Sequence, residues 1–201
     1  MNAARHHEPT NNLAVPTAVD WVLETGVVVA AAHAQRLATR RVRVQTLPNG
    51  GPSGSCRALM SAPRYLAPEQ LVDPASADER SDVWALGVVL FELVAGVAPI
   101  PARSYLELRH ILLSSEPVPP LDLLAPHVPP AFARVVACAL EKDRELRYPS
   151  LVELADALAP FGGELAAQSA GRIAALLGPP RSGVAAASPR RLRVDRRSRP
   201  E

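Results

Sequence analysis

The chain has 201 residues, enough for one domain with flexible ends and too few for two large lobes. Hydrophobic residues make up 48% and aromatic residues 4%, which is typical of a soluble, mostly helical protein with a core of Ala, Leu and Val. The net charge is +2, but residues 181–201 hold seven arginines and two acids and carry +5, which leaves the rest at −3. The single lysine, Lys142, excludes mechanisms that need a lysine elsewhere in the chain.

Cysteine content and hydropathy exclude several protein classes. Cys56 and Cys138 form no CxxC, so neither a zinc site nor a secreted disulfide framework is expected. The opening residues lack the apolar stretch of a signal peptide, and the longest apolar run, 83–91, has nine residues against the roughly 20 that span a bilayer. We therefore expect a cytoplasmic protein with no membrane span.

The first half of the chain predicts one helix and one short strand. Residues 1–16 lack periodicity and are expected to be disordered. Apolar residues then recur at helical spacing to about Leu37, behind a possible N-terminal box of Thr17 and Asp20, although Gly26 weakens this helix. Residues 41–47 alternate polar and apolar side chains and predict a strand that ends in a turn.

A helix that is apolar all round is predicted from Asp82 to before Gly96, with Ser81 as its cap, and such a helix belongs in the centre of a core. Two capping boxes predict amphipathic surface helices after Ser104 and after Ser150. Between them lie a proline-rich connection at 116–130 and a helix around 132–140. An Ala-rich stretch to Leu177 predicts a weak helix, followed by a low-complexity tail.

Three motifs occur in order: SAPRYLAPEQ at 61–70, SDVWALGVVLFELVAG at 81–96 and LEKDRELRYPSLVELADAL at 140–158. Together they resemble the C-terminal lobe of bacterial Ser/Thr protein kinases. The resemblance implies a mainly α fold, the helical C-lobe of a protein-kinase-like fold, with at most a short β element and disordered ends. Together with the composition, it divides the chain into four predicted segments. These are a disordered N-terminus at 1–16, a degenerate helix and catalytic-loop-like region at 17–60, the C-lobe at 61–161, and a mostly disordered Ala/Arg/Pro-rich tail at 162–201.

The resemblance also assigns structural roles to motif residues. It implies that Glu69 pairs with Arg147 and that Asp82 orients the catalytic loop. A buried carboxylate needs such a bidentate partner, whereas the alternative is that these residues are solvent-exposed charges. The full set of motif positions is Ala67, Pro68, Glu69, Asp82, Trp84, Gly87 and Arg147.

Departures from the kinase pattern concern catalysis. The sequence has no DFG triplet, and Lys142 follows the central helix, where it cannot bind ATP phosphates. A weaker resemblance at 31–47 places Thr39, Arg40 and Arg41 on the HRD triplet, with Arg43 at the loop lysine and Thr46 at the metal-binding asparagine. A guanidinium cannot accept a substrate proton. The alternative is an unrelated amphipathic helix and strand.

These features predict an inactive kinase-like protein, either a pseudokinase or a truncated kinase, that acts as an interaction module through a protein partner or self-association. We expect no catalytic residue, no metal site and no cofactor, with ATP and magnesium bound only if the missing parts come from elsewhere. One alternative is a fragment of an active Ser/Thr kinase that phosphorylates protein Ser/Thr. Another is nucleic-acid binding by the arginine tail, which no aromatic residue accompanies.

Overall fold

The computed structural model describes residues 12–39 and 63–180, and these residues form helices and short 3-10 turns with no strand. The predicted mainly helical C-lobe fold is confirmed, while the predicted strand at 41–47 lies outside the described residues. The helices are α1 (Val15–Thr39), α3 (Pro68–Val72), α4 (Glu79–Ala95), α5 (Tyr105–Leu113), α6 (Leu121–Leu124), α7 (Pro130–Ala139), α8 (Leu151–Leu158) and α9 (Glu164–Leu177). The 3-10 turns are Pro63–Tyr65, Pro74–Ser76, Arg144–Leu146 and Ala159–Phe161.

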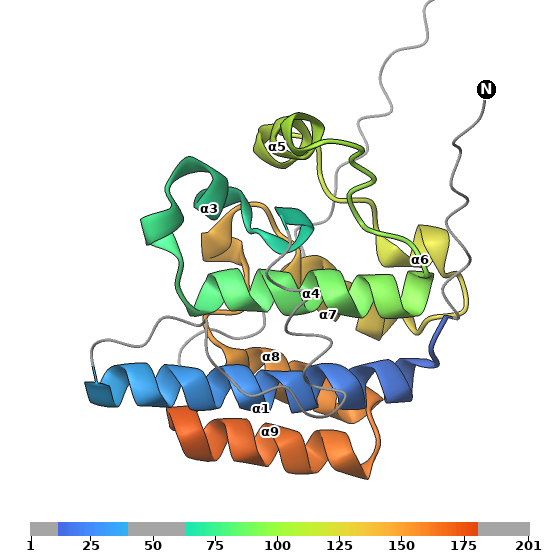
Figure 1. Ribbon diagram of the computed structural model, residues 1–201. Coiled ribbons are helices and arrows are strands. Elements are labelled where there is room, and N and C mark those ends of the chain that lie inside the picture. The colour runs from blue at the N-terminus through green and yellow to red at the C-terminus, as the bar shows by residue number, and fades with distance from the viewer. Residues whose placement is uncertain (1–11, 40–62, 181–201) are drawn as a thin grey trace, which may run out of the picture.

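Helix α4 crosses the middle of the molecule, with α5 on one side of it and α1 on the other (Figure 1). Its apolar residues face neighbours all round, and Trp84, Leu86 and Phe91 are fully buried. It ends at Gly96, whose φ of 71° lies in the left-handed region that glycine adopts without steric cost. The prediction of a central buried helix is confirmed.

The start of α4 differs from the prediction, which placed the cap at Ser81. The helix begins three residues earlier because the Asp78 carboxylate accepts a hydrogen bond from the Arg80 amide at 2.9 Å and serves as the cap. Ser81 lies in the first turn instead, and its hydroxyl donates to Glu69 Oε1 at 2.8 Å. A side chain read as a local cap therefore makes a long-range contact.

The two other predicted serine caps are confirmed. Ser104 Oγ accepts from the Glu107 amide at 3.1 Å at the start of α5, and Ser150 Oγ accepts from the Val152 amide at 3.1 Å at the start of α8. Helix α8 is more buried than a surface helix, because most of its side chains lie in the core. The buried residues of α8 are Leu151, Val152, Leu154, Ala155 and Leu158.

Gly87 sets the distance between α4 and α7. A Cβ at this position would lie 3.0 Å from Ala139 Cβ and 3.2 Å from Leu140 Cδ2. Because real Cβ atoms rarely come this close, a larger residue would push the two helices apart. The motif glycine is therefore explained by helix packing.

Helix α1 begins at Val15, two residues before the predicted start, so Thr17 and Asp20 lie inside the helix and do not form its N-terminal box. The Asp20 carboxylate instead accepts hydrogen bonds at 2.9 Å from the amides of Gly163 and Ala166. These amides are at the start of α9, which has no side-chain cap of its own. Asp20 thus caps a helix more than 140 residues away along the chain.

Helix α9 is a 14-residue element and not the weak helix of a tail. It packs along α1, which lies between α4 and α9 (Figure 1), and its residues Ala166, Ala170 and Ile173 are buried. Gly26 of α1 makes room for it, since a Cβ there would lie 3.1 Å from Ile173 Cδ1. The helical unit therefore continues to Leu177, beyond the boundary expected at residue 161.

One segment of α1, Val15–Gln35, is long and apolar enough to cross a membrane by length and composition alone, with a mean hydropathy of 1.4 in its most apolar window. Half of that window is buried inside the protein. Asp20 and Glu24 interrupt this segment, so it contains no long uninterrupted apolar run that would indicate a membrane span in the sequence. A core helix of a soluble protein meets the same criterion, so the segment is weak support for a membrane span.

Candidate functional site

The predicted pair of Glu69 and Arg147 is present, and it is buried. Glu69 lies in the first turn of α3, which Pro68 opens, and Arg147 follows the 3-10 turn Arg144–Leu146. Arg147 Nη1 donates to Glu69 Oε1 and Nη2 donates to Glu69 Oε2, both at 2.8 Å. The two side chains are 0% exposed for Arg147 and 12% for Glu69. This parallel two-bond geometry is the strong form of a carboxylate–guanidinium pair.

Arg147 uses all five of its N–H donors. Besides the carboxylate, its nitrogens donate to the carbonyl oxygens of Glu141 at 2.6 Å, Arg80 at 3.1 Å and Lys142 at 3.2 Å. Its guanidinium carbon lies 5.0 Å from the centre of the Trp84 ring, a cation–π contact. The motif residues Glu69, Trp84 and Arg147 thus form one cluster, which joins α3, α4 and the segment after α7.

The electrostatics of Glu69 follow from this environment. Burial would raise the pKa of its carboxyl, but the hydrogen bonds and charge of Arg147, together with the Ser81 hydroxyl, outweigh burial and lower that pKa below its ordinary value. Glu69 is therefore ionised at neutral pH, and the cluster is a charged pair. All the polar side-chain atoms of Glu69 and Arg147 make hydrogen bonds within the fold.

Asp82 joins α4 to α1. Its Oδ2 lies 2.7 Å from Nε2 of His33, and the histidine side chain is largely buried. No pattern in the sequence indicates this contact, because the two residues are 49 positions apart and meet only when the helices pack. The role of Asp82 in orienting a catalytic loop stays a prediction.

The proposed catalytic-loop positions are mostly beyond the structural description. Thr39 is the last residue of α1, whereas Arg40, Arg41, Arg43 and Thr46 lie outside the described residues. Their alignment with a kinase catalytic loop stays a prediction. Within residues 12–39 and 63–180, no group of three or more His, Cys, Asp or Glu side chains could hold a metal ion.

Sequence reasoning missed Glu92 on α4. Its Oε2 accepts a hydrogen bond from the Tyr65 hydroxyl at 2.7 Å, and its Oε1 lies 3.8 Å from Nη1 of Arg64. A signal was available, because Glu92 is the one acidic residue of α4 after Asp82, in an otherwise apolar stretch. A lone carboxylate in a buried helix needs a partner, and here Tyr65 supplies it.

The single lysine, Lys142, is bound at the C-terminal end of α5. Its ammonium donates to the carbonyl oxygen of Ile111, to the carbonyl oxygen of Ser114 at 3.1 Å and to the Ser114 hydroxyl at 3.3 Å. A kinase lysine that binds ATP phosphates comes from a strand in the other lobe. Lys142 does not fit that role, because its donors are occupied by backbone within the helical lobe.

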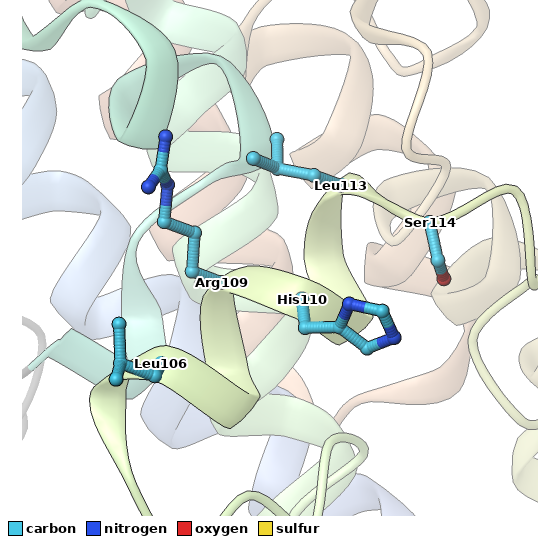
Figure 2. A pocket seen from close by; sticks show the side chains of 5 residues that line it. All are labelled: Leu106, Arg109, His110, Leu113 and Ser114. Carbon is cyan, nitrogen blue, oxygen red and sulfur yellow. The ribbon is translucent and has the colours of Figure 1, made fainter.

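Helix α5 has apolar side chains on two faces. Leu108 and Leu112 are buried, whereas Leu106 and Leu113 are 75% and 45% exposed. Figure 2 shows Arg109 on the helix between the two exposed leucines and His110 beside it. We call the residues that line this shallow hollow the α5 surface: Leu106, Arg109, His110, Leu113 and Ser114.

Comparison with known sequences places these features in a family. A family model described as protein tyrosine and serine/threonine kinase matches residues 54–158, which is just over half of the chain. The match contains the Glu69 and Arg147 cluster and helices α3 to α8. Helices α1 and α9 lie outside it.

Individual relatives are bacterial. The serine/threonine-protein kinase PknL of Mycobacterium tuberculosis is 34% identical over 112 residues, 56% of this chain and 28% of that protein. PknA of the same species is 32% identical over 170 residues, 75% of this chain and 38% of that protein. PksC of Streptomyces coelicolor is 36% identical over 98 residues, 49% of this chain and 17% of that protein. The chain thus spans well under half the length of these relatives, and it belongs to the protein tyrosine and serine/threonine kinase family through its helical C-lobe.

Proposed function

We propose that this chain is a catalytically inactive, cytoplasmic protein-kinase-like module that acts by binding another protein. The observation that carries the proposal is the position of Lys142. It is the only lysine in the sequence, and its ammonium caps α5 in the helical lobe. Kinases depend on a lysine that holds the ATP phosphates, and this chain has no second lysine to do so.

The residues aligned with the catalytic loop support the same proposal. In the predicted alignment Arg41 takes the position of the catalytic base, and a guanidinium has no acceptor for the substrate proton. The same alignment puts Arg43 at the loop lysine and Thr46 at the metal-binding asparagine, and threonine lacks the amide oxygen that binds magnesium there. We therefore expect neither ATP nor magnesium to bind.

Thermal unfolding with and without Mg-ATP tests the inactivity. Saturation at 100 times a dissociation constant would stabilise the native state by about 2.7 kcal/mol, so real nucleotide affinity would be visible as a raised melting temperature. We expect no shift with Mg-ATP relative to magnesium alone, and no transfer of phosphate to the chain itself or to a generic protein substrate. A clear shift would contradict the proposal.

The α5 surface supports the interaction role. Leu106 and Leu113 lie one heptad apart and are exposed, with Arg109 between them. Exposed apolar side chains that gather on one surface are typical of protein-binding sites. Arg109 gives this surface a positive charge, and His110 adds a ring that can form hydrogen bonds. The partner that fits is a protein segment, most simply a helix, that presents apolar side chains flanked by carboxylates.

Paired variants test this surface. The double change Leu106→Ser and Leu113→Ser removes the exposed leucines and leaves the buried face of α5 intact. We expect it to abolish self-association or partner capture that wild type shows, and to leave the melting temperature within a few degrees. Leu123→Ser is the matched control, because Leu123 is an equally exposed leucine on α6. Equal losses in the double variant and the control would refute the assignment of the surface.

A second candidate is part of an active Ser/Thr kinase. The relatives named above are serine/threonine-protein kinases, and this chain covers 17% to 38% of their lengths. In that case a glycine-rich loop, a strand lysine and an HRD triplet would be encoded next to this sequence or on a partner chain. Reading the adjacent genomic sequence distinguishes the two candidates at once.

A further inference from the structure

Helix α5 is thinly attached to the rest of the domain. Of its nine residues only Leu108 and Leu112 are buried. The helix it packs against most is α3, which has five residues. In Figure 1, α5 lies apart from the layers formed by α4, α1 and α9. A short helix with so few buried side chains needs further contacts to keep one orientation.

Lys142 supplies such a contact at the C-terminal end of the helix. The last carbonyl groups of a helix have no partner within it, and a cation there is favoured by the helix dipole. The Lys142 ammonium donates to the carbonyl oxygens of Ile111 and Ser114, from a point 28 to 31 residues further along the chain. Burial lowers the pKa of Lys142, while the nearby Glu116 carboxylate acts in the opposite direction.

The same residue is tied to the buried cluster. The carbonyl oxygen of Lys142 accepts a hydrogen bond from Arg147 Nη2 at 3.2 Å, and Arg147 in turn holds Glu69. The backbone of Lys142 is thereby bonded to the buried Glu69 and Arg147 cluster, while its side chain extends to the end of α5. Its ammonium also lies 3.3 Å from the hydroxyl of Ser114, which lines the α5 surface.

We propose that Lys142 is a latch that fixes α5 against the lobe and so controls the presentation of the α5 surface. The effect of the latch on partner binding rests on the proposed interaction role of that surface. The attachment of α5 to the lobe by Lys142 does not depend on that role. Loss of the single ammonium charge, by substitution or by acylation of the amine, frees the end of α5 while the Glu69 and Arg147 cluster stays in place. Partner binding that neutralised the ammonium would have the same effect.

Hydrogen–deuterium exchange of the full chain tests the latch without any partner. Lys142→Met keeps the aliphatic side chain and removes the charge and the donors. We expect amides of α5 to exchange at least about tenfold faster, the change that the loss of one charge-assisted hydrogen bond gives, with α4 and α8 unchanged. Lys142→Arg keeps a charged donor, so it should restore most of the protection. Unchanged exchange in α5, or equal acceleration in α4 and α8, would overturn the proposal.

Chemical modification gives an independent readout. Because Lys142 is the only lysine, an amine-acylating reagent can modify only its side chain and the N-terminal amine. Acylation should loosen α5 in wild type and have no effect on α5 exchange in Lys142→Arg. If α5 loosens while the Leu106 and Leu113 double variant binds like wild type, the latch stands and the proposed function of the surface fails. If α5 does not loosen, the latch fails whatever the surface does.

Discussion

Replacing Arg147 by alanine should greatly lower the free energy of unfolding of this lobe. The substitution removes five hydrogen bonds and the contact with the Trp84 ring. It leaves the Glu69 carboxylate without its cation and with the Ser81 hydroxyl as its remaining side-chain donor, and it removes a donor from three backbone carbonyls. Breaking a buried ion pair from one side typically costs about 3 to 5 kcal/mol. An exposed pair would lose at most about 1 kcal/mol. The structure places this pair firmly in the first range, because Arg147 is 0% exposed.

Urea melts followed by far-UV circular dichroism measure this loss. We expect Arg147→Ala to lower the free energy of unfolding by about 3 to 5 kcal/mol. The urea concentration at the midpoint should fall by this loss divided by the slope of the transition, which is about 1 to 3 kcal/mol per molar urea. Arg134→Ala is the matched control, since Arg134 is an exposed arginine on α7, and it should change stability by less than about 0.5 kcal/mol.

Glu69→Gln and the double variant complete the cycle. Glu69→Gln alone should also be destabilising, because Arg147 loses its charged acceptor, and the coupling energy should exceed about 0.5 kcal/mol. If Arg147→Ala melts within about 1 kcal/mol of wild type, the reasoning about burial is wrong.

Three further outcomes are expected. Because Arg147 lowers the folded-state pKa of Glu69 below its ordinary 4.5, the stabilisation is complete above that value and is lost as the pH falls through it towards the lower folded pKa. Urea midpoints measured from pH 6 down to pH 3 should therefore fall more steeply in wild type than in Glu69→Gln. Removing the long-range cap with Asp20→Ala should cost about 1 to 2 kcal/mol and accelerate amide exchange at the start of α9, whereas Asp156→Ala, an exposed acid on α8, should do neither. Burial and the nearby Glu141 carboxylate raise the pKa of the Cys138 thiol to about 11. In a Cys56→Ser background, iodoacetamide at pH 8 should then alkylate the half-buried Cys138 at least about tenfold more slowly in the native protein than in urea, and equal rates would contradict the raised thiol pKa.

The sequence predicted what depends on local pattern or on family motif. The serine caps at 104 and 150 were correct because each side chain bonds to an amide within three residues. The Glu69 and Arg147 pair spans 78 residues, and no periodicity in the sequence indicates it; the family motif alone did so.

The misses are residues whose partner is remote. Asp20 looked like a local cap, but its acceptor atoms serve α9, 143 residues away. The Ala-rich stretch that forms α9 was predicted to be a weak helix. Helix propensity and sequence pattern do not indicate that α1 packs against it and stabilises it. Gly26 was expected to weaken the helix, although the approach of Ile173 favours a small residue there. Side chains that serve packing between distant helices cannot be told from their neighbours by sequence alone.

The pairing of α1 with α9 has a consequence for synthesis of the chain. Asp20 cannot find the amide of Ala166 until 146 further residues have been made, which takes roughly 7 to 30 s at 5 to 20 residues per second. During that interval α9, which packs on this side of α1 in the folded protein, has not yet been made. We therefore expect the α9-facing side of α1 to be exposed transiently in the nascent chain, as the kind of apolar surface that chaperones bind.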